Sequence, residues 1–343
     1  MKNVTIVDIA QKTGLSLATV SRALNGQSNV KAETKEKVLK AARALGYQQN
    51  ILAKQLNSPS DKNNAIKTIG MLIPDIRTPF YGRIFSSCAK YALEMGYMMS
   101  LSNSFNDLKL EHRFYDQMLA QHAYGVIQIG GSLDRENIPQ TLFNQIRSAA
   151  EKIPVVTSVQ VPSTQSRCVY VDNKKCMRML MEYLIKLGHK RIAFVGGRNT
   201  VISTIEKRTE FLKAAQEHSI TDARICEGDY GQEYGYITTK RLIHQEFSPT
   251  AIIAITDTCA IGVMRALNEL GLVCPNDVSV VSFDNTYIAE MLDPELTSVS
   301  VDYDVLSRTM VNTLVNMIEK RAAEDVYELP VTFTIRESCT NIV

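Results

Sequence analysis

The repeated strand and helix pattern after residue 66 constrains the fold of this 343-residue chain more than any other feature. Short runs rich in β-branched residues alternate there with helical patterns, which is typical of a parallel α/β sheet. Because the series occurs twice, the sequence predicts two similar doubly wound lobes with a ligand crevice at the carboxyl ends of their strands. The runs of the first series are residues 69–74, 126–130 and 153–157. Their counterparts in the second series are residues 192–197, 252–256 and 277–281.

Composition is that of a globular chain, with 45% hydrophobic and 22% charged residues. No apolar run approaches the length of a membrane-spanning helix, and Asp8 stands where a signal peptide needs an apolar stretch. The seven cysteines are scattered and include no Cys-x-x-Cys pair, which argues against a disulfide framework and a zinc site. We therefore expect a cytoplasmic protein with no metal, no cofactor and no membrane partner.

Positive charge is concentrated at the N-terminus. Residues 1–62 contain ten Lys and Arg against four Asp and Glu, whereas the remainder contains 28 against 32. A basic head on a mildly acidic body indicates that only the head meets a polyanion. A solvated helical surface that happens to be basic would give the same count, so charge alone does not decide between the two.

Three short helices are predicted over residues 1–46. Thr5 and Asp8 match a capping box at the start of the first helix, and Gly14 ends that helix. Ser16 is a natural N-cap for the second helix. Two helices across a tight turn, supported by a third, form the helix-turn-helix arrangement. A small helical bundle whose polar residues face water is the alternative.

The second helix presents side chains suited to DNA away from its apolar stripe. Arg22 is placed to bind a guanine edge through two hydrogen bonds. Hydroxyl and amide side chains near it suit phosphate oxygens, and two small apolar side chains suit thymine methyl groups or packing within the head. The hydroxyl and amide side chains are those of Ser16, Thr19, Ser21 and Asn25, and the apolar ones are those of Leu17 and Ala18.

Several motifs follow one another along the whole chain. Residues 4–10 read VTIVDIA and residues 14–26 read GLSLATVSRALNG, and further motifs lie at 45–47, 187–193 and 277–284. Together they resemble the LacI family of bacterial transcription regulators. The resemblance implies a regulator that binds a DNA operator as a homodimer and responds to a small metabolite held between its lobes.

The resemblance also implies that residues 50–58 form a hinge helix on the operator, with Leu56 entering the minor groove. Asn50 is a suitable N-cap, and Ala53 and Leu56 lie on one apolar stripe. The segment is too short to be helical alone, so it would fold on DNA, and the alternative is a flexible linker. Gln49 stands where the family usually has a proline, directly before Asn50. The predicted DNA-contacting residues are Thr5, Ser16, Leu17, Ala18, Thr19, Ser21, Arg22, Asn25, Asn29, Tyr47, Asn50, Ala53 and Leu56.

These observations divide the chain into a helix-turn-helix head at 1–46, a hinge and linker at 47–65 and an effector-binding core at 66–343. The resemblance implies three crossovers between the lobes, which we place near Val161, Ile288 and Arg321. The first lobe is then expected at 66–160 and 289–321, and the second at 161–288 and 322–343.

Residues that contact the effector should follow the strands. A polar residue at the end of a strand is often only a loop residue, and this alternative stands for each candidate. Asp284 and Tyr230 are the strongest candidates, because the resemblance places a hydroxyl-binding acid and a stacking aromatic at these positions. The candidates are Asp75, Phe80, Tyr81, Asn103 and Ser132 in the first lobe, and Ser203, Lys207, Tyr230, Thr256 and Asp284 in the second.

Departures from the family pattern concern the chemistry of the effector. Lys207 stands where the family usually has an arginine, Thr256 where it has an asparagine, and Val159 or Gln160 where it commonly has an aspartate. Loss of an acid with retention of a cation predicts a sugar acid or a sugar phosphate rather than a neutral sugar. Lys207 extending toward solvent is the alternative.

Catalytic signatures are absent from the sequence. The five histidines are spread out, and no His-Glu-x-x-His, Gly-x-Ser-x-Gly or Walker loop occurs, so we expect no enzyme. A solute-binding protein would share the two lobes but would not need a basic helical head. An architectural DNA-binding protein with an inert core would show no effector response. The sequence favours a ligand-controlled repressor that binds a near-palindromic operator as a dimer.

Overall fold

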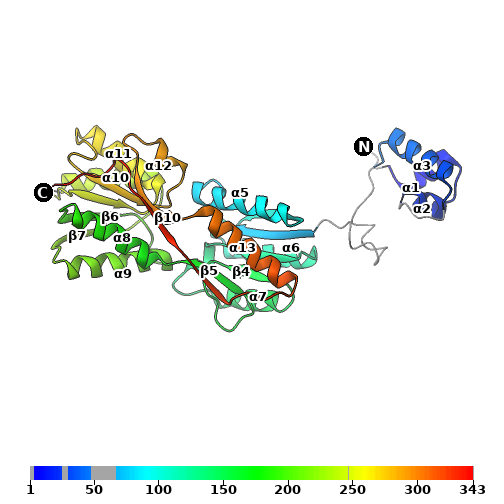
Figure 1. The fold of residues 1–343 in the computed structure, drawn as a ribbon, viewed down its shortest axis with the longest axis horizontal. Helices are drawn as coiled ribbons and strands as arrows, with labels where there is room; N and C mark the ends of the chain where they lie inside the picture. Colours follow the sequence, from blue (N-terminus) through cyan, green and yellow to red (C-terminus); the bar gives the residue numbers. More distant parts are fainter. Residues whose placement is uncertain (1–3, 25–29, 48–66, 246, 343) are drawn as a thin grey trace. The chain divides into compact units, whose positions relative to one another are not determined.

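The structure, a computed structural model, describes residues 4–24, 30–47, 67–245 and 247–342. The chain divides into two compact units, Met1–Ile66 and Lys67–Val343, the first helical and the second α/β (Figure 1). The predicted DNA contacts Asn25, Asn29, Asn50, Ala53 and Leu56 lie outside the described residues.

The first unit contains the three predicted helices, α1 (Ile6–Thr13), α2 (Leu17–Leu24) and α3 (Ala32–Leu45). The capping box of α1 is confirmed, because Asp8 Oδ2 accepts hydrogen bonds of 2.7 Å from both the backbone N and the Oγ1 of Thr5. Ser16 Oγ accepts a bond of 3.2 Å from the backbone N of Thr19 and caps α2. Each helix contributes apolar side chains to one small core.

The second unit contains two sheets, each built from six strands within the described residues. The first consists of β1 (Lys67–Ile73), β2 (Tyr97–Asn103), β3 (Gly125–Gln128), β4 (Val155–Thr157), β5 (Arg167–Val171) and β11 (Val326–Leu329). The second consists of β6 (Arg191–Val195), β7 (Asp222–Cys226), β8 (Ala251–Ala254), β9 (Ser279–Phe283), β10 (Thr297–Val301) and β12 (Val331–Thr334). The strand orders are β11-β5-β4-β3-β1-β2 and β12-β10-β9-β8-β6-β7, so the second sheet repeats the first.

The predicted duplication is therefore confirmed, and all six predicted runs are strands: β1, β3 and β4, then β6, β8 and β9. The sheets differ at one edge, since β11 runs parallel to β5 whereas β12 runs antiparallel to β10. Apart from the β10–β12 pair, neighbouring strands are parallel, as a doubly wound fold requires.

The lobe limits predicted from the sequence were wrong by about one strand at each crossover. The chain crosses after β5, β10 and β11 instead of near Val161, Ile288 and Arg321. The strand β10 reads Thr-Ser-Val-Ser-Val and is buried throughout, so its hydroxyl side chains conceal a central strand. The strands β5 and β11 are only partly buried and give weak apolar signals.

Helices pack on both faces of the first sheet. The helices of this lobe are α5 (Pro79–Glu94), α6 (Leu108–Ala120), α7 (Gln140–Ala150) and α13 (Tyr303–Ile318), with the 3₁₀ turn η2 (Gly131–Asp134). Residues of β1 alternate between the two layers: Ile69 and Met71 pack with α5 and α13, and Leu72 packs with α6 and α7. Figure 1 shows α5 and α13 side by side, although they are far apart in the sequence.

The second lobe has one continuous apolar core. Its helices are α8 (Asn173–Lys186), α9 (Ile202–Glu217), α10 (Gln232–His244), α11 (Asp257–Glu269) and α12 (Tyr287–Met291). The helix α8 packs with α9, and α10 packs with α11. None of the described helices combines the length and apolar sequence that a membrane crossing requires.

Candidate functional site

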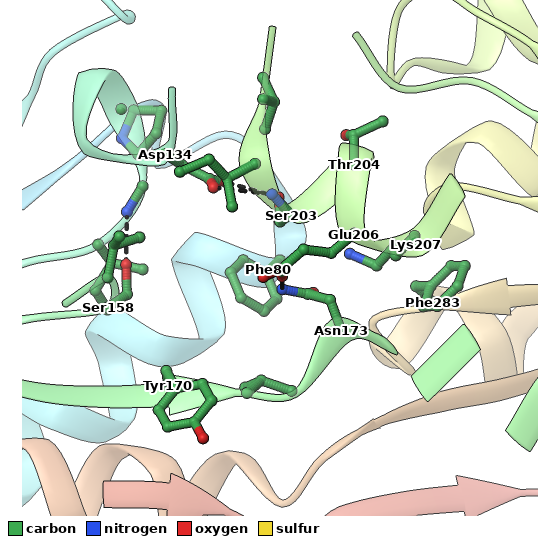
Figure 2. A pocket seen from close by; sticks show the side chains of 18 of the residues that line it. Phe80, Asp134, Ser158, Tyr170, Asn173, Ser203, Thr204, Glu206, Lys207 and Phe283 are labelled. Carbon is green, nitrogen blue, oxygen red and sulfur yellow. Dashed lines mark hydrogen bonds between the residues drawn. The ribbon is translucent and has the colours of Figure 1, made fainter. Parts of the chain in front are cut away.

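A cavity of about 1040 Å³ lies between the two lobes. Its walls contain residues that follow β1, β3 and β4 in the first lobe and β6, β8 and β9 in the second. The carboxyl ends of parallel strands are the usual ligand sites of doubly wound folds. Figure 2 shows that polar side chains from both lobes point into this space, among them Asp134, Ser203 and Lys207.

Most of the predicted effector-contacting residues line this cavity. Two do not: Asn103 Oδ1 accepts a hydrogen bond of 3.1 Å from the backbone N of Ile76, and Ser132 is buried beneath the wall. Both follow a strand, but their side chains serve the local backbone or the interior. The residues that do line the cavity are Asp75, Phe80, Tyr81, Ser203, Lys207, Tyr230, Thr256 and Asp284.

Some of these lining residues already use their polar groups within the protein. The carboxylate of Asp75 binds the exposed Arg77, at 2.7 Å from Nη2, which holds the pKa of Asp75 below its usual range. Thr256 Oγ1 donates to the backbone O of Tyr230 at 2.8 Å. Tyr230 OH lies 2.9 Å from Thr204 Oγ1. These groups shape the wall more than they offer free hydrogen bonds.

Asp284 follows β9 and is half-buried, with a φ of 93°. Its backbone is fixed, because its N donates to the O of Val299 at 3.0 Å and its O accepts from Tyr303 OH at 2.6 Å. Burial and the neighbouring carboxylate of Asp257 raise the pKa of Asp284 to about 7, while Lys207 opposes the shift. Asp284 is therefore a carboxyl group able to donate or accept a hydrogen bond near neutral pH.

A buried network supports Asp284 from behind. Asp257, at the start of α11, accepts hydrogen bonds from Ser282 Oγ at 2.5 Å, from Ser298 Oγ at 3.1 Å, and from N and Oγ1 of Thr286 at 2.6 and 2.8 Å. Burial raises the pKa of Asp257, and the four hydrogen bonds oppose the shift. Serines and a threonine that look like surface residues in the sequence are thus interior donors.

Lys207 lies over an aromatic ring inside the cavity. Its Nζ is 4.9 Å from the centre of the Phe283 ring, a cation–π distance, and its side chain is half-buried. The preceding residue, Glu206, accepts a hydrogen bond of 2.9 Å from Asn173 Nδ2 (Figure 2). Lys207 is therefore placed to meet a ligand.

Asp134 connects the two lobes directly and was missed by sequence reasoning. It ends η2 in the first lobe, and its carboxylate accepts hydrogen bonds from N and Oγ of Ser203, at 3.0 and 2.6 Å, where α9 begins (Figure 2). The backbone N of Glu136 also donates to the O of Thr200 at 3.1 Å. Burial raises the pKa of Asp134. The rule that selected Ser132 after β3 also applies to Asp134, two residues later.

Further polar residues of the wall were not predicted either. Arg198 follows β6 and lines the cavity, and its Nη2 lies 3.4 Å from Asp229 Oδ1. Tyr170, on β5, donates to Glu328 of the neighbouring β11 at 2.8 Å. No cluster of three or more metal-ligating side chains occurs within the ranges that the structure describes.

The helical head presents a second candidate surface, along α2. Leu17, Ala18 and Arg22 are exposed, with Leu17 49% exposed, whereas Val20 and Ala23 on the opposite side are buried. An exposed leucine and arginine on one face are available to a partner. Other predicted residues serve the head itself, since Ser16 caps α2 and Tyr47 packs against the small core.

Comparison with known proteins gives matches to both units. Residues 5–50 match the family described as bacterial regulatory proteins, lacI family, and residues 181–339 match a periplasmic binding protein-like domain. The chain is 32% identical over 341 residues to catabolite control protein A of Priestia megaterium, covering 98% of this chain and 99% of that protein. It is 28% identical to the HTH-type transcriptional repressor PurR of Histophilus somni (strain 129Pt), with 97% and 98% covered.

Solved structures agree with these matches. The lac repressor dimer bound to operator and the anti-inducer ONPF superposes with a TM-score of 0.79 at 27% identity, covering 99% of this chain and 100% of that chain. The transcriptional regulator CelR in complex with cellobiose has a TM-score of 0.68 at 24% identity, with 98% and 100% covered, and at that identity the likeness shows the fold alone.

Proposed function

Because this chain belongs to the LacI family of bacterial DNA-binding transcription regulators, we propose that it is a repressor that binds a near-palindromic operator as a homodimer under the control of a small metabolite. Regulators of this family are not enzymes, and they act in the cytoplasm. The observation that carries the proposal is the pairing of an exposed α2 face with a large inter-lobe cavity in one chain.

The exposed face of α2 supports sequence-specific binding. In a helix-turn-helix protein the second helix lies in the major groove, so Arg22 would reach a guanine edge while Leu17 and Ala18 contact apolar base edges. Residues 1–62 contain more basic than acidic residues, and their basic side chains would contact DNA phosphates. Such contacts make the affinity for DNA fall steeply as the salt concentration rises.

Exposed apolar side chains on the core support a homodimer. Met98 on β2 and Leu93 on α5 are 53% and 68% exposed, and Met291 on α12 is 78% exposed. Contact with a second subunit would remove these side chains from water. The lac repressor, at 27% identity, is a dimer on its operator.

The effector that the cavity suits best is rich in hydroxyl groups. The carboxyl group of Asp284 accepts hydrogen bonds when ionised and donates one when protonated, and Phe80 provides an aromatic face for the apolar side of a sugar ring. The acidic lining residues outnumber the basic ones, which favours a neutral sugar over the anionic effector predicted from the sequence. The acids are Asp75, Asp134, Glu136, Glu206, Asp229 and Asp284, and the bases are Arg135, Arg198 and Lys207.

An acidic sugar remains a second candidate because of Lys207. Its ammonium group over Phe283 is a cation inside the cavity, where a carboxylate or phosphate would be less screened than at the surface. Titrating the operator complex with neutral sugars and with the matching sugar acids separates the candidates. Release or tightening by a sugar acid alone, lost in Lys207→Met, would favour the anionic effector.

Operator selection tests the DNA-binding proposal. The purified chain is mixed with a random duplex library, and retained sequences are read. A two-fold symmetric site supports the dimeric repressor, whereas retention without enrichment would contradict it and favour the architectural alternative.

Arg22→Ala tests the role of α2 on the selected site. Loss of a bidentate contact should reduce discrimination at one base position by about 1–3 kcal/mol and relax the preference there. Lys40→Ala, which removes the same charge from an exposed position on α3, should leave base preference unchanged. If Arg22→Ala kept the same base preference at that position as Lys40→Ala, the major-groove role of Arg22 would be excluded.

A further inference from the structure

Glu111 is a fully buried carboxyl group that does not line the cavity. It lies on α6, and its Oε1 accepts a hydrogen bond of 2.8 Å from the backbone N of Ser132. Among the described residues, neither its Oε2 nor Ser132 Oγ has a hydrogen bond of good geometry, although the side chains of Ser132 and Ser104 lie near enough to oppose the rise in the pKa of Glu111 that burial causes. A buried carboxyl is costly, so the fold must gain something from its position.

The backbone of η2 lies directly against this carboxyl. Gly130 and Gly131 adopt φ values of 66° and 72°, and a Cβ built on Gly131 would lie 2.6 Å from Glu111 Oε1. The entry to the turn is fixed separately, because Gly130 N donates to Ser158 Oγ at 3.1 Å. Glycine is needed here so that the chain can approach the carboxyl and turn sharply.

The other end of η2 carries the contact between the lobes. Asp134 is two residues after Ser132, and it holds N and Oγ of Ser203 in the second lobe. A four-residue turn fixed at Ser132 leaves Asp134 little freedom, and Asp134 contacts the start of α9. We infer that Glu111 is a positioning residue that fixes η2 from beneath and thereby sets the closure of the cleft by Asp134. This inference rests on the proposed function, because we take closure of the cleft around the small metabolite as the motion through which the metabolite controls the protein.

Amide hydrogen exchange of the full chain tests the inference without any effector or DNA. Glu111→Leu keeps the volume of the side chain but removes the acceptor, and it should speed exchange at the amides of Ser132 and Ser203 by about tenfold or more. Glu111→Gln retains an acceptor oxygen and should restore both rates. Asp134→Ala, as the matched control, should speed exchange at Ser203 and leave Ser132 protected.

Three outcomes would overturn the inference. The first is an unchanged Ser203 amide in Glu111→Leu, which would show that the turn holds its place without the carboxyl. The second is faster exchange throughout the first lobe, including β3, which would make Glu111 a general determinant of the fold. The third is failure of both Glu111→Leu and Glu111→Ala to fold while Glu111→Gln folds. Because no operator is used, failure of the repressor proposal would leave these results interpretable.

Discussion

The two lobes share one strand order but place their cleft carboxylates in different ways. In the second lobe, Asp284 follows β9 directly and is backed by Asp257, whose oxygens accept four hydrogen bonds. In the first lobe, Asp134 stands at the end of a turn and is backed by Glu111, whose second oxygen has no hydrogen bond of good geometry among the described residues. The repeated fold thus carries a fully paired support on one side and a partly paired support on the other.

The difference indicates that the supports of the two cleft acids differ in rigidity. A carboxylate whose two oxygens accept four hydrogen bonds resists rearrangement, so the second lobe should present its acid in one position. Within its own lobe, the turn of Asp134 is held by one hydrogen bond to Glu111 and one to Ser158, so it has fewer interactions to lose than Asp257. The first lobe is therefore the side that we expect to move when the cleft opens.

The largest predicted effect follows from removing the carboxylate of Asp257. Asp257→Ala would leave the donors of Ser282, Ser298 and Thr286 buried without an acceptor, and we expect the free energy of unfolding to fall by about 3 kcal/mol or more. Urea denaturation measures this change, with Glu182→Ala on an exposed site of α8 as the control. A loss below about 1 kcal/mol would show that the network adds little, and the contrast between the lobes would fail.

A smaller effect tests the other support. Gly131→Ala places a Cβ against Glu111 at a φ of 72°, and we expect a loss of about 2 kcal/mol. Gly271→Ala is the matched control, because Gly271 has the same φ of 72° but a Cβ there meets nothing within 4 Å. The control should lose about 1 kcal/mol, from backbone strain alone. Equal losses would show that the approach to Glu111 is not tight.

The sequence predicted the repeated sheets because their central strands are apolar runs. The strand β8 reads Ala-Ile-Ile-Ala and is fully buried, so its composition and its place in the sheet agree. The strand β10 could not be recognised in the same way, because Ser298 and Ser300 are polar in the sequence but bond within a buried network or lie in the core. Burial of hydroxyl groups depends on partners distant in the chain, which a local pattern does not contain.

Sequence reasoning likewise identified only some residues of the candidate site. Asp284 follows a recognisable strand and lines the cavity, as expected. Asp134 lies beyond a glycine turn, so its direction depends on Glu111 of another helix, and the neighbouring Ser132 was selected instead. The role of Asp257 depends on four donor groups of three residues, which lie on β9, on β10 and at the start of α12. Strand ends can be read from sequence, whereas the supports behind them require the fold.

The last prediction concerns pH, and it compares the two acids directly. The pKa of Asp284 is about 7 in the folded chain against an ordinary 3.8, so the unfolded chain loses this proton at lower pH than the folded chain. The contribution of Asp284 to stability is therefore complete below about pH 4 and declines as the pH rises to about 7.

Urea unfolding at about pH 5 and pH 8 should show this decline in the native chain and a smaller one in Asp284→Asn. Asp134 and Glu111, whose pKa values are also raised by burial, contribute in the same direction to both proteins and cancel in the difference. Asp257 does not cancel, because Asp284→Asn removes the repulsion between the two carboxylates, and its contribution adds to the difference. Asp134→Asn provides the counterpart in the first lobe. If its pH dependence flattens more than that of Asp284→Asn, the first lobe holds its acid in the more protonated state. Asp134, and not Asp284, would then be the cleft acid with the more strongly raised pKa.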